Sequence, residues 1–233
     1  MRYKAVLFDV DGTLVDSNDA HAHAWVAAFA GSGITVDFAH VRRSIGMGGD
    51  KLMPEVAGIT EESPLGKQIG ERRGDIFTSK YLPQIRPFPG ARELVAAIKA
   101  RGLAAVAASS AKEDELRSLL RIAGAESLLD AATSSDDAEE SKPDPDIIHA
   151  ALRKAQAEPT NAVLIGDTPY DVEAARRAGV DCIAFRSGGW QDRDLRGTIA
   201  IYDGPADLLA RLADLQRLPP SGGGSENRSR SFG

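Results

Sequence analysis

Two segments of the chain place carboxylates where an apolar run ends. Asp9 and Asp11 follow the apolar residues 5–8, and Asp167 follows the apolar residues 162–165. Because residues two apart on a strand point to the same side, Asp9 and Asp11 are expected to present paired carboxylates at one spot. Three carboxylates that converge repel one another unless a cation lies between them, and an all-oxygen ligand set suits Mg²⁺. The pattern therefore predicts a Mg²⁺ site that includes Asp167.

Residues of complementary chemistry follow two further segments. Ser109 directly follows the apolar run 103–108 and offers a hydroxyl at an expected helix start, an arrangement that binds anions. Lys142 precedes a proline, which restrains the backbone, and its ammonium is expected over the edge of the sheet. Asp171 is either an ordinary acid of a first helical turn or an acceptor that supports the metal ligands. Acids, a metal, a lysine and a helix-start hydroxyl together predict a phosphoryl-transfer site.

The elements that must position these residues can be read from the apolar runs. Five runs are continuous rather than alternating, as in strands buried on both faces of a parallel sheet: residues 5–8, 103–108, 162–165, 182–185 and 199–202. Helical patterns lie between them, including residues 112–122 and a helix that begins at Thr168-Pro169 and ends at Gly179. Strands and helices in alternation predict an α/β fold with a parallel sheet, which binds ligands at the carboxyl ends of its strands.

One region interrupts the alternation. Residues 16–83 carry helical patterns only, and the proline-rich stretch 82–90 then ends them. We therefore expect a small helical insertion at residues 16–83, between the first strand and the rest of the sheet. The core then comprises residues 1–15 and 84–218. Residues 219–233 have the composition of a flexible linker and are expected to form a tail.

The composition excludes several classes of protein. Of the 233 residues, 42% are hydrophobic and 27% are charged, which is ordinary globular composition. The net charge of −6, without a basic stripe, argues against a nucleic-acid partner. No apolar run approaches a membrane span, and residues 5–8 are too short for a signal peptide. Cys182 is the single cysteine and cannot form an internal disulfide, so a reducing, cytoplasmic compartment is expected. The oligomeric state is left open.

The four strand ends, in their order along the chain, resemble the motifs of the haloacid dehalogenase-like superfamily of phosphotransferases. The motifs read Asp9-Val10-Asp11-Gly12-Thr13, then Ser109, then Lys142-Pro143-Asp144, then Gly166-Asp167-Thr168-Pro169-Tyr170-Asp171. The resemblance extends to about Leu218. It implies a Rossmann-like, doubly wound core with a small α-helical cap inserted after the first motif, at the place of the helical insertion.

The resemblance also implies roles for these residues. Asp9 would be the nucleophile that forms an aspartyl-phosphate, and Asp11 would protonate the leaving oxygen and then activate water. Mg²⁺ would lie between Asp9, the main-chain oxygen of Asp11, and Asp167. Ser109 and Lys142 would bind the substrate. The dehalogenase and phosphonate-cleaving branches depart from an acid at the Asp11 position, so the expected substrate is a phosphate ester.

The cap is expected to choose the substrate, in part through residues 45–51. His21 resembles a hinge-proximal histidine of the β-phosphoglucomutase branch. That branch, however, carries basic residues for a second phosphate where this chain has Ile45 and Gly49. Contact with metal or substrate is left open for Asp171, His21, Arg42, Arg43 and Lys51.

The sequence therefore predicts a Mg²⁺-dependent phosphatase that hydrolyses a small phosphorylated metabolite, either phosphoglycolate-like or a sugar phosphate. Two alternatives stay open. One is a sugar phosphomutase of the β-phosphoglucomutase type. The other is a catalytically inactive binding or regulatory protein on the same scaffold, which is disfavoured because every motif position carries a chemically suitable residue.

Overall fold

The computed structural model describes residues 2–213 and residue 215 of the chain. The tail expected at residues 219–233 lies outside the described residues. Within them, no helix combines the length and the apolar character needed to cross a lipid bilayer.

A six-stranded sheet forms the centre of the fold, and all of its neighbouring strands are parallel. Along the sheet the strands are ordered β3 (Ala131–Thr133), β2 (Ala104–Ala108), β1 (Ala5–Phe8), β4 (Ala162–Gly166), β5 (Asp181–Phe185) and β6 (Ala200–Tyr202). The predicted α/β fold with a parallel sheet is confirmed. The sequence did not predict β3, because its three small residues form no recognisable apolar run.

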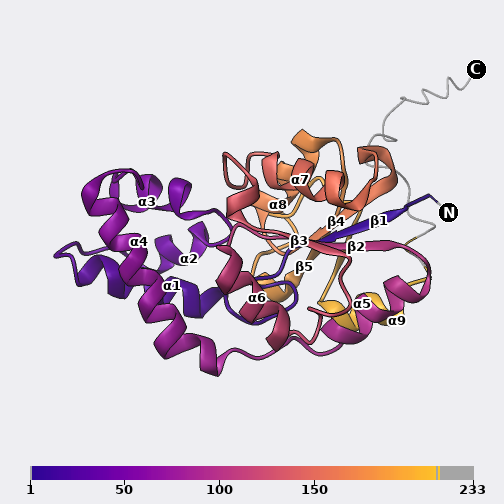
Figure 1. Ribbon diagram of the computed structural model, residues 1–233, viewed down its shortest axis with the longest axis horizontal. Coiled ribbons are helices and arrows are strands. Elements are labelled where there is room, and N and C mark those ends of the chain that lie inside the picture. Colours follow the sequence, from indigo (N-terminus) through magenta and orange to yellow (C-terminus); the bar gives the residue numbers. More distant parts are fainter. Residues whose placement is uncertain (1, 214, 216–233) are drawn as a thin grey trace, which may run out of the picture.

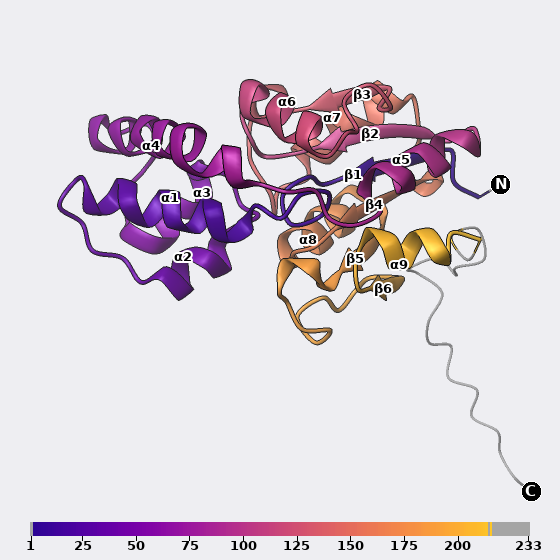
Figure 2. The same ribbon diagram turned by 90° about the horizontal axis from the view of Figure 1, so that it is seen from below.

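Helices cover both faces of the sheet, which explains why its strands are continuously apolar (Figures 1 and 2). One face packs on α5 (Ala91–Ala100), α6 (Glu113–Ile122) and α9 (Pro205–Ala210), and the other packs on α7 (Asp146–Ala155) and α8 (Pro169–Ala178). In β1, Val6 and Phe8 enter the first of these two cores, whereas Ala5 and Leu7 enter the second. Short 3₁₀ turns lie at η3 (Ser135–Asp137), η4 (Pro159–Asn161) and η5 (Arg186–Gly188).

Between β1 and α5 the chain is helical, as the sequence predicts. The elements are α1 (Asn18–Ala30), α2 (Phe38–Ser44), α3 (Gly49–Ala57), α4 (Pro64–Ile76), the π-helical turn η1 (Phe77–Tyr81) and the 3₁₀ turn η2 (Leu82–Gln84). We refer to α1–η2 as the inserted helices. Trp25, Phe29, Val41, Leu52 and Ile69 give them a hydrophobic core of their own. They lie beside the sheet, at the end where the chain leaves β1 and continues into α1 (Figures 1 and 2).

The register of the sheet decides which residues meet at that end. Phe8 of β1 lies opposite Ala107 of β2 and Ile165 of β4. The residues that follow these positions therefore leave the sheet at nearly the same level. They include Asp9, Ser109 and Asp167, which were predicted to meet there.

Candidate active site

Lys142 lies at the centre of a buried cluster of charges. Its side chain is 1% exposed, and its Nζ lies 2.6 Å from Oδ1 of Asp9 and 2.8 Å from Oδ1 of Asp171. Burial lowers the pKa of Lys142, but the Asp171 and Asp9 carboxylates outweigh it, so that its pKa lies above the ordinary value. The ammonium therefore stays charged and joins the end of β1 to the start of α8.

Asp171 supports this cluster through the first turn of α8. Its Oδ2 accepts hydrogen bonds from the backbone N–H of Asp167 (3.3 Å) and of Thr168 (3.1 Å), while Oγ1 of Thr168 accepts one from the N–H of Asp171 (3.2 Å). This is a capping box, which satisfies the free N–H groups at a helix start. Asp171 is thus a first-turn acid and also an acceptor that holds the backbone of Asp167 and the side chain of Lys142.

The acids in the cluster carry more negative charge than Lys142 can balance. Burial, together with the carboxylates of Asp171 and Asp11, outweighs the opposing effect of Lys142 and raises the pKa of Asp9 to about 7. Burial together with the Asp9 and Asp171 carboxylates raises the pKa of Asp167 well above its usual range. A bound cation would relieve this repulsion.

Carboxylate oxygens of Asp9, Asp167 and Asp171 lie within 4.8 Å of one another, so that this acidic cluster can bind a metal ion. Asp167 is held in place by Thr13, whose hydroxyl donates to Oδ1 (3.1 Å), and by Asn18, whose amide donates to Oδ2 (2.8 Å). The loop at Gly12 approaches so closely that a Cβ there would lie 2.1 Å from Oδ2 of Asp167. An all-oxygen donor set held this rigidly fits a hard divalent cation.

The side chain of Asp11 lies apart from this metal cluster and contacts the inserted helices. Its Oδ1 accepts hydrogen bonds from Oγ of Ser17 and from Nε2 of His21, the latter at 2.7 Å. Arg73 of α4 donates from Nη2 to Nδ1 of His21 at 2.9 Å. Because arginine can only donate, Nδ1 must accept and Nε2 must carry the proton that faces Asp11. Burial raises the pKa of Asp11, but His21, Ser17 and Arg73 outweigh burial and lower it.

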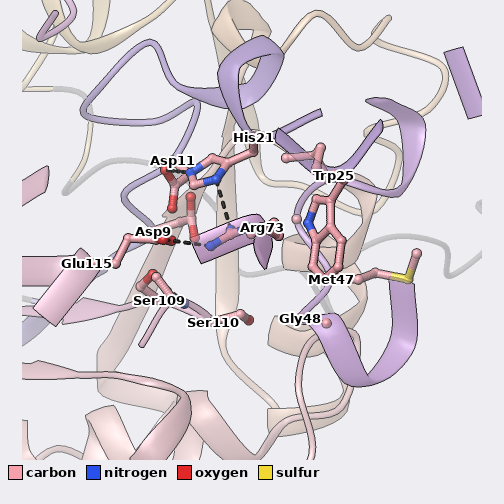
Figure 3. A pocket seen from close by; sticks show the side chains of 14 residues that line it. Asp9, Asp11, His21, Trp25, Met47, Gly48, Arg73, Ser109, Ser110 and Glu115 are labelled. Carbon is pink, nitrogen blue, oxygen red and sulfur yellow. Dashed lines mark hydrogen bonds and ion pairs between the residues drawn. The ribbon is translucent and has the colours of Figure 1, made fainter. Parts of the chain in front are cut away.

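A small cavity of about 60 Å³ lies between the sheet and the inserted helices (Figure 3). From the core it is lined by Asp9, Asp11 and Ser109, and from the inserted helices by His21, Trp25, Arg73 and the loop 45–49. The predicted residues Asp9, Asp11 and Ser109 thus line one cavity, and Lys142 and Asp167 lie next to Asp9.

Arg42, Arg43 and Lys51 lie elsewhere, outside the described lining of this cavity. Arg42 donates from Nη2 to the carbonyl of Gly188 (2.8 Å), and Arg43 stacks over Trp190. Lys51 forms ion pairs with Glu140 and Asp144. These three residues join the inserted helices to the core.

Arg73 and Glu115, two charged residues of the cavity, were not predicted from the sequence. Arg73 is one of two adjacent arginines on a polar helix, and Glu115 lies in the acidic first turn of α6. Nothing in their local sequence separates them from solvated charges. A single sequence carries no signal for them, because they meet only when α4 packs beside α6.

The comparison with protein families agrees with this geometry. Residues 6–185 match the model of the haloacid dehalogenase-like hydrolases, so the chain belongs to that family. It is an enzyme, a hydrolase of the phosphatase type.

Particular relatives extend the match over most of the chain. The chain is 30% identical to the phosphoglycolate phosphatase of Rhodospirillum rubrum over 230 residues, which cover 94% of this chain and 93% of that protein. It is 34% identical over 216 residues to the chloroplastic protein SUPPRESSOR OF QUENCHING 1 of Arabidopsis thaliana; these residues are 87% of this chain but only 20% of that protein. Among solved structures, a hydrolase from Pseudomonas syringae has a TM-score of 0.85 at 29% identity, covering 91% of this chain and 99% of that one.

Replacing Lys142 by Met should destabilise the fold, because two buried carboxylates would lose their shared cation. We expect the free energy of unfolding in metal-free buffer to fall by about 3–5 kcal/mol. Adding Asp171→Asn should restore part of that loss. Urea denaturation followed by circular dichroism measures both effects. The control is Lys154→Met at a partly exposed ion pair with Asp137, which should change stability by less than about 0.5 kcal/mol. A Lys142→Met variant as stable as this control would contradict the ion-pair account.

Proposed function

We propose that the protein is a Mg²⁺-dependent phosphatase that hydrolyses a small phosphorylated metabolite, either phosphoglycolate-like or a sugar phosphate, through an aspartyl-phosphate intermediate. One observation carries the proposal. The buried Asp9 carboxylate lies between Lys142 and Asp167 and faces the same small cavity as Asp11. A nucleophile beside a cation, with a proton carrier facing the same cavity, is what phosphoryl transfer requires.

In the proposed first step, Asp9 attacks the phosphorus of the ester. Lys142 holds Oδ1 of Asp9, which leaves Oδ2 to form the new P–O bond. The bond from phosphorus to the leaving oxygen breaks, and Asp11 gives its proton to that oxygen. The approaching phosphate dianion raises the pKa of Asp11 and so favours the protonated form that this step needs.

In the second step, water attacks the phosphorus of the aspartyl-phosphate. Asp11 accepts a proton from the water, inorganic phosphate leaves, and the Asp9 carboxylate is restored. His21, Ser17 and Arg73 lower the pKa of Asp11, which keeps its carboxyl group ionised and so able to accept the proton here. Mg²⁺, held by Asp9, Asp167 and the main-chain oxygen of Asp11, would supply positive charge against the phosphate oxygens.

The inserted helices act in this proposal as a cap domain over residues 16–83, with residues 1–15 and 84–218 as the catalytic core. Ser109 and Lys142 bind the phosphate. A cytoplasmic location is supported by Cys182, which is buried and unpaired. The substrate is a small phosphorylated metabolite rather than a nucleic acid, as the net charge of −6 favours.

Hydrolysis rather than isomerisation is the expected outcome of the second step. Ile45 and Gly49 line the cavity where a mutase needs basic residues for a second phosphate. We expect β-glucose 1-phosphate with a trace of the bisphosphate to give inorganic phosphate without glucose 6-phosphate. Coupled dehydrogenase and molybdate assays on one reaction measure both products. Glucose 6-phosphate forming faster than free phosphate would favour the mutase, and neither product from any monoester would favour the inactive scaffold.

Removal of the Asp9 nucleophile should abolish turnover without unfolding the protein. We expect Asp9→Asn to lower kcat by more than about 10³-fold and Asp11→Asn by about 10²–10⁴-fold. Steady-state phosphate release measures both, and single-turnover phosphorylation of Asp9 separates the two steps. Asp75→Asn, at an exposed position on α4, is the control and should keep full activity. Several per cent of activity in Asp9→Asn would rule out a covalent role.

Metal dependence should follow from the acidic cluster. EDTA should abolish phosphate release and Mg²⁺ should restore it. We expect Asp167→Ala to weaken the apparent Mg²⁺ affinity by at least about 10-fold, because it removes a ligand from a rigid site. The rise in melting temperature with Mg²⁺ concentration gives this affinity without turnover, with Asp75→Ala as the control. Full activity in chelator would exclude the metal site.

A further inference from the structure

An ion pair between the inserted helices and the core forms one wall of the cavity. Nη1 of Arg73, on α4, donates to Oε2 of Glu115, on α6, at 2.6 Å. The Arg73 side chain is 18% exposed and that of Glu115 is 10% exposed. Both residues line the same cavity as Asp9 and Asp11, and Figure 3 shows Arg73 extending toward His21. Since Glu115 neutralises Arg73, this wall carries no net charge.

Three buried polar atoms in this wall lack a hydrogen-bond partner among the described residues. They are Nε of Arg73, Oε1 of Glu115 and Oγ of Ser110. The first is a donor, the second an acceptor, and the third can be either. Buried polar groups without partners cost free energy, so a ligand that supplies both donors and acceptors would be stabilised here. Hydroxyl groups have this dual character, whereas a carboxylate can only accept.

An aromatic surface adjoins these atoms. Trp25 lines the cavity, and the guanidinium of Arg73 lies 5.4 Å from its ring centroid. The face of an indole ring packs well against the C–H groups of a carbon skeleton. Trp25 can therefore cover the apolar face of a molecule whose hydroxyls reach Arg73, Glu115 and Ser110.

The space beyond the wall is strongly acidic. A wider cleft of about 730 Å³ shares Trp25, Arg73, Ser110 and Glu115 with the small cavity, so these residues stand where one opens into the other. Among the described residues, nine acidic and two basic side chains line this cleft. Burial and the neighbouring Asp50 carboxylate raise the pKa of Glu61 at its wall. A substrate held with its phosphate in the cavity therefore extends its leaving group into a field that repels a second anion.

We propose that Arg73, Glu115 and Ser110 form a leaving-group subsite for the hydroxyls of a neutral polyol or sugar phosphate, and that the subsite disfavours esters whose leaving group carries a carboxylate. The proposal rests on the phosphatase function proposed above and chooses between the two substrate classes left open there. Arg73 is the obvious partner for a carboxylate, but its Nη1 and Nη2 atoms already donate to Glu115 and His21, and Glu115 neutralises its charge. A carboxylate that reached its Nε would lie beside Glu115.

A matched pair of substrates tests the charge of the leaving group. Glycerol 3-phosphate and 3-phosphoglycerate share a three-carbon skeleton and differ in a hydroxymethyl against a carboxylate. We expect kcat/KM to favour glycerol 3-phosphate by at least about 10-fold, since the wrong charge leaves buried groups unpaired. p-Nitrophenyl phosphate, which has no hydroxyls, serves as the reference for the chemical steps. A preference for 3-phosphoglycerate, with the reference ester hydrolysed, would overturn the subsite and leave the phosphatase standing. No hydrolysis of any of the three would overturn both.

Two substitutions test the named residues. Glu115→Gln keeps the shape but frees the charge of Arg73, so the preference for glycerol 3-phosphate should fall by at least about 10-fold. Ser110→Ala should lower kcat/KM for glycerol 3-phosphate relative to the reference ester by about 3–10-fold, through KM rather than kcat. The control is Glu126→Gln, which is paired with Arg121 at the surface outside both the cavity and the cleft and should leave the preference unchanged. If Glu115→Gln lowers kcat/KM for all three esters by the same factor, Glu115 only positions Arg73 and His21, and the subsite is refuted.

Discussion

The shared ion pair of Lys142 with Asp9 and Asp171 is the interaction on which the rest of the site depends. One ammonium, almost wholly buried, holds carboxylates that come from the end of β1 and from the first turn of α8. Burying charges is expensive unless they are closely paired, so these three residues can keep their charges only in this arrangement. Asp171 in turn holds the backbone at Asp167. Lys142 thus fixes the positions of two proposed metal ligands, Asp9 directly and Asp167 through Asp171.

The same cluster is left with an excess of negative charge, and this excess defines the chemistry. Lys142 cannot neutralise Asp9, Asp167 and Asp171 together, as the raised pKa values of Asp9 and Asp167 record. A divalent cation bound by this cluster would complete the balance and make the site attractive to a phosphate dianion. A site with more lysines and fewer acids would bind phosphate as well, but it would offer no carboxylate free to attack it.

A second series of side-chain contacts connects the site to the inserted helices. Asp11 contacts His21, His21 contacts Arg73, and Arg73 contacts Glu115 of the core. The last of these contacts, between Arg73 and Glu115, forms only while α4 lies beside α6. The group proposed to carry the proton and the groups proposed to recognise the leaving group therefore belong to one hydrogen-bonded path. Under these proposals, the path would link recognition of the leaving group to the protonation state of Asp11.

The sequence by itself determined the sheet and most of the core half of the site. Asp9, Ser109 and Asp167 could be found because each follows an apolar strand, and parallel strands bring their carboxyl ends to one edge. Lys142 was found by its place in the order of motifs. The short strand β3 was missed because Ala131–Thr133 has no pattern of its own and is a strand only by pairing with β2.

The tertiary structure alone decided the other half of the site. Trp25, Arg73 and Glu115 lie on helices whose local patterns do not distinguish them from ordinary core or surface residues. Which of their side chains face the cavity depends on how the inserted helices pack against α6, and packing between elements distant in the chain leaves no mark on the local sequence.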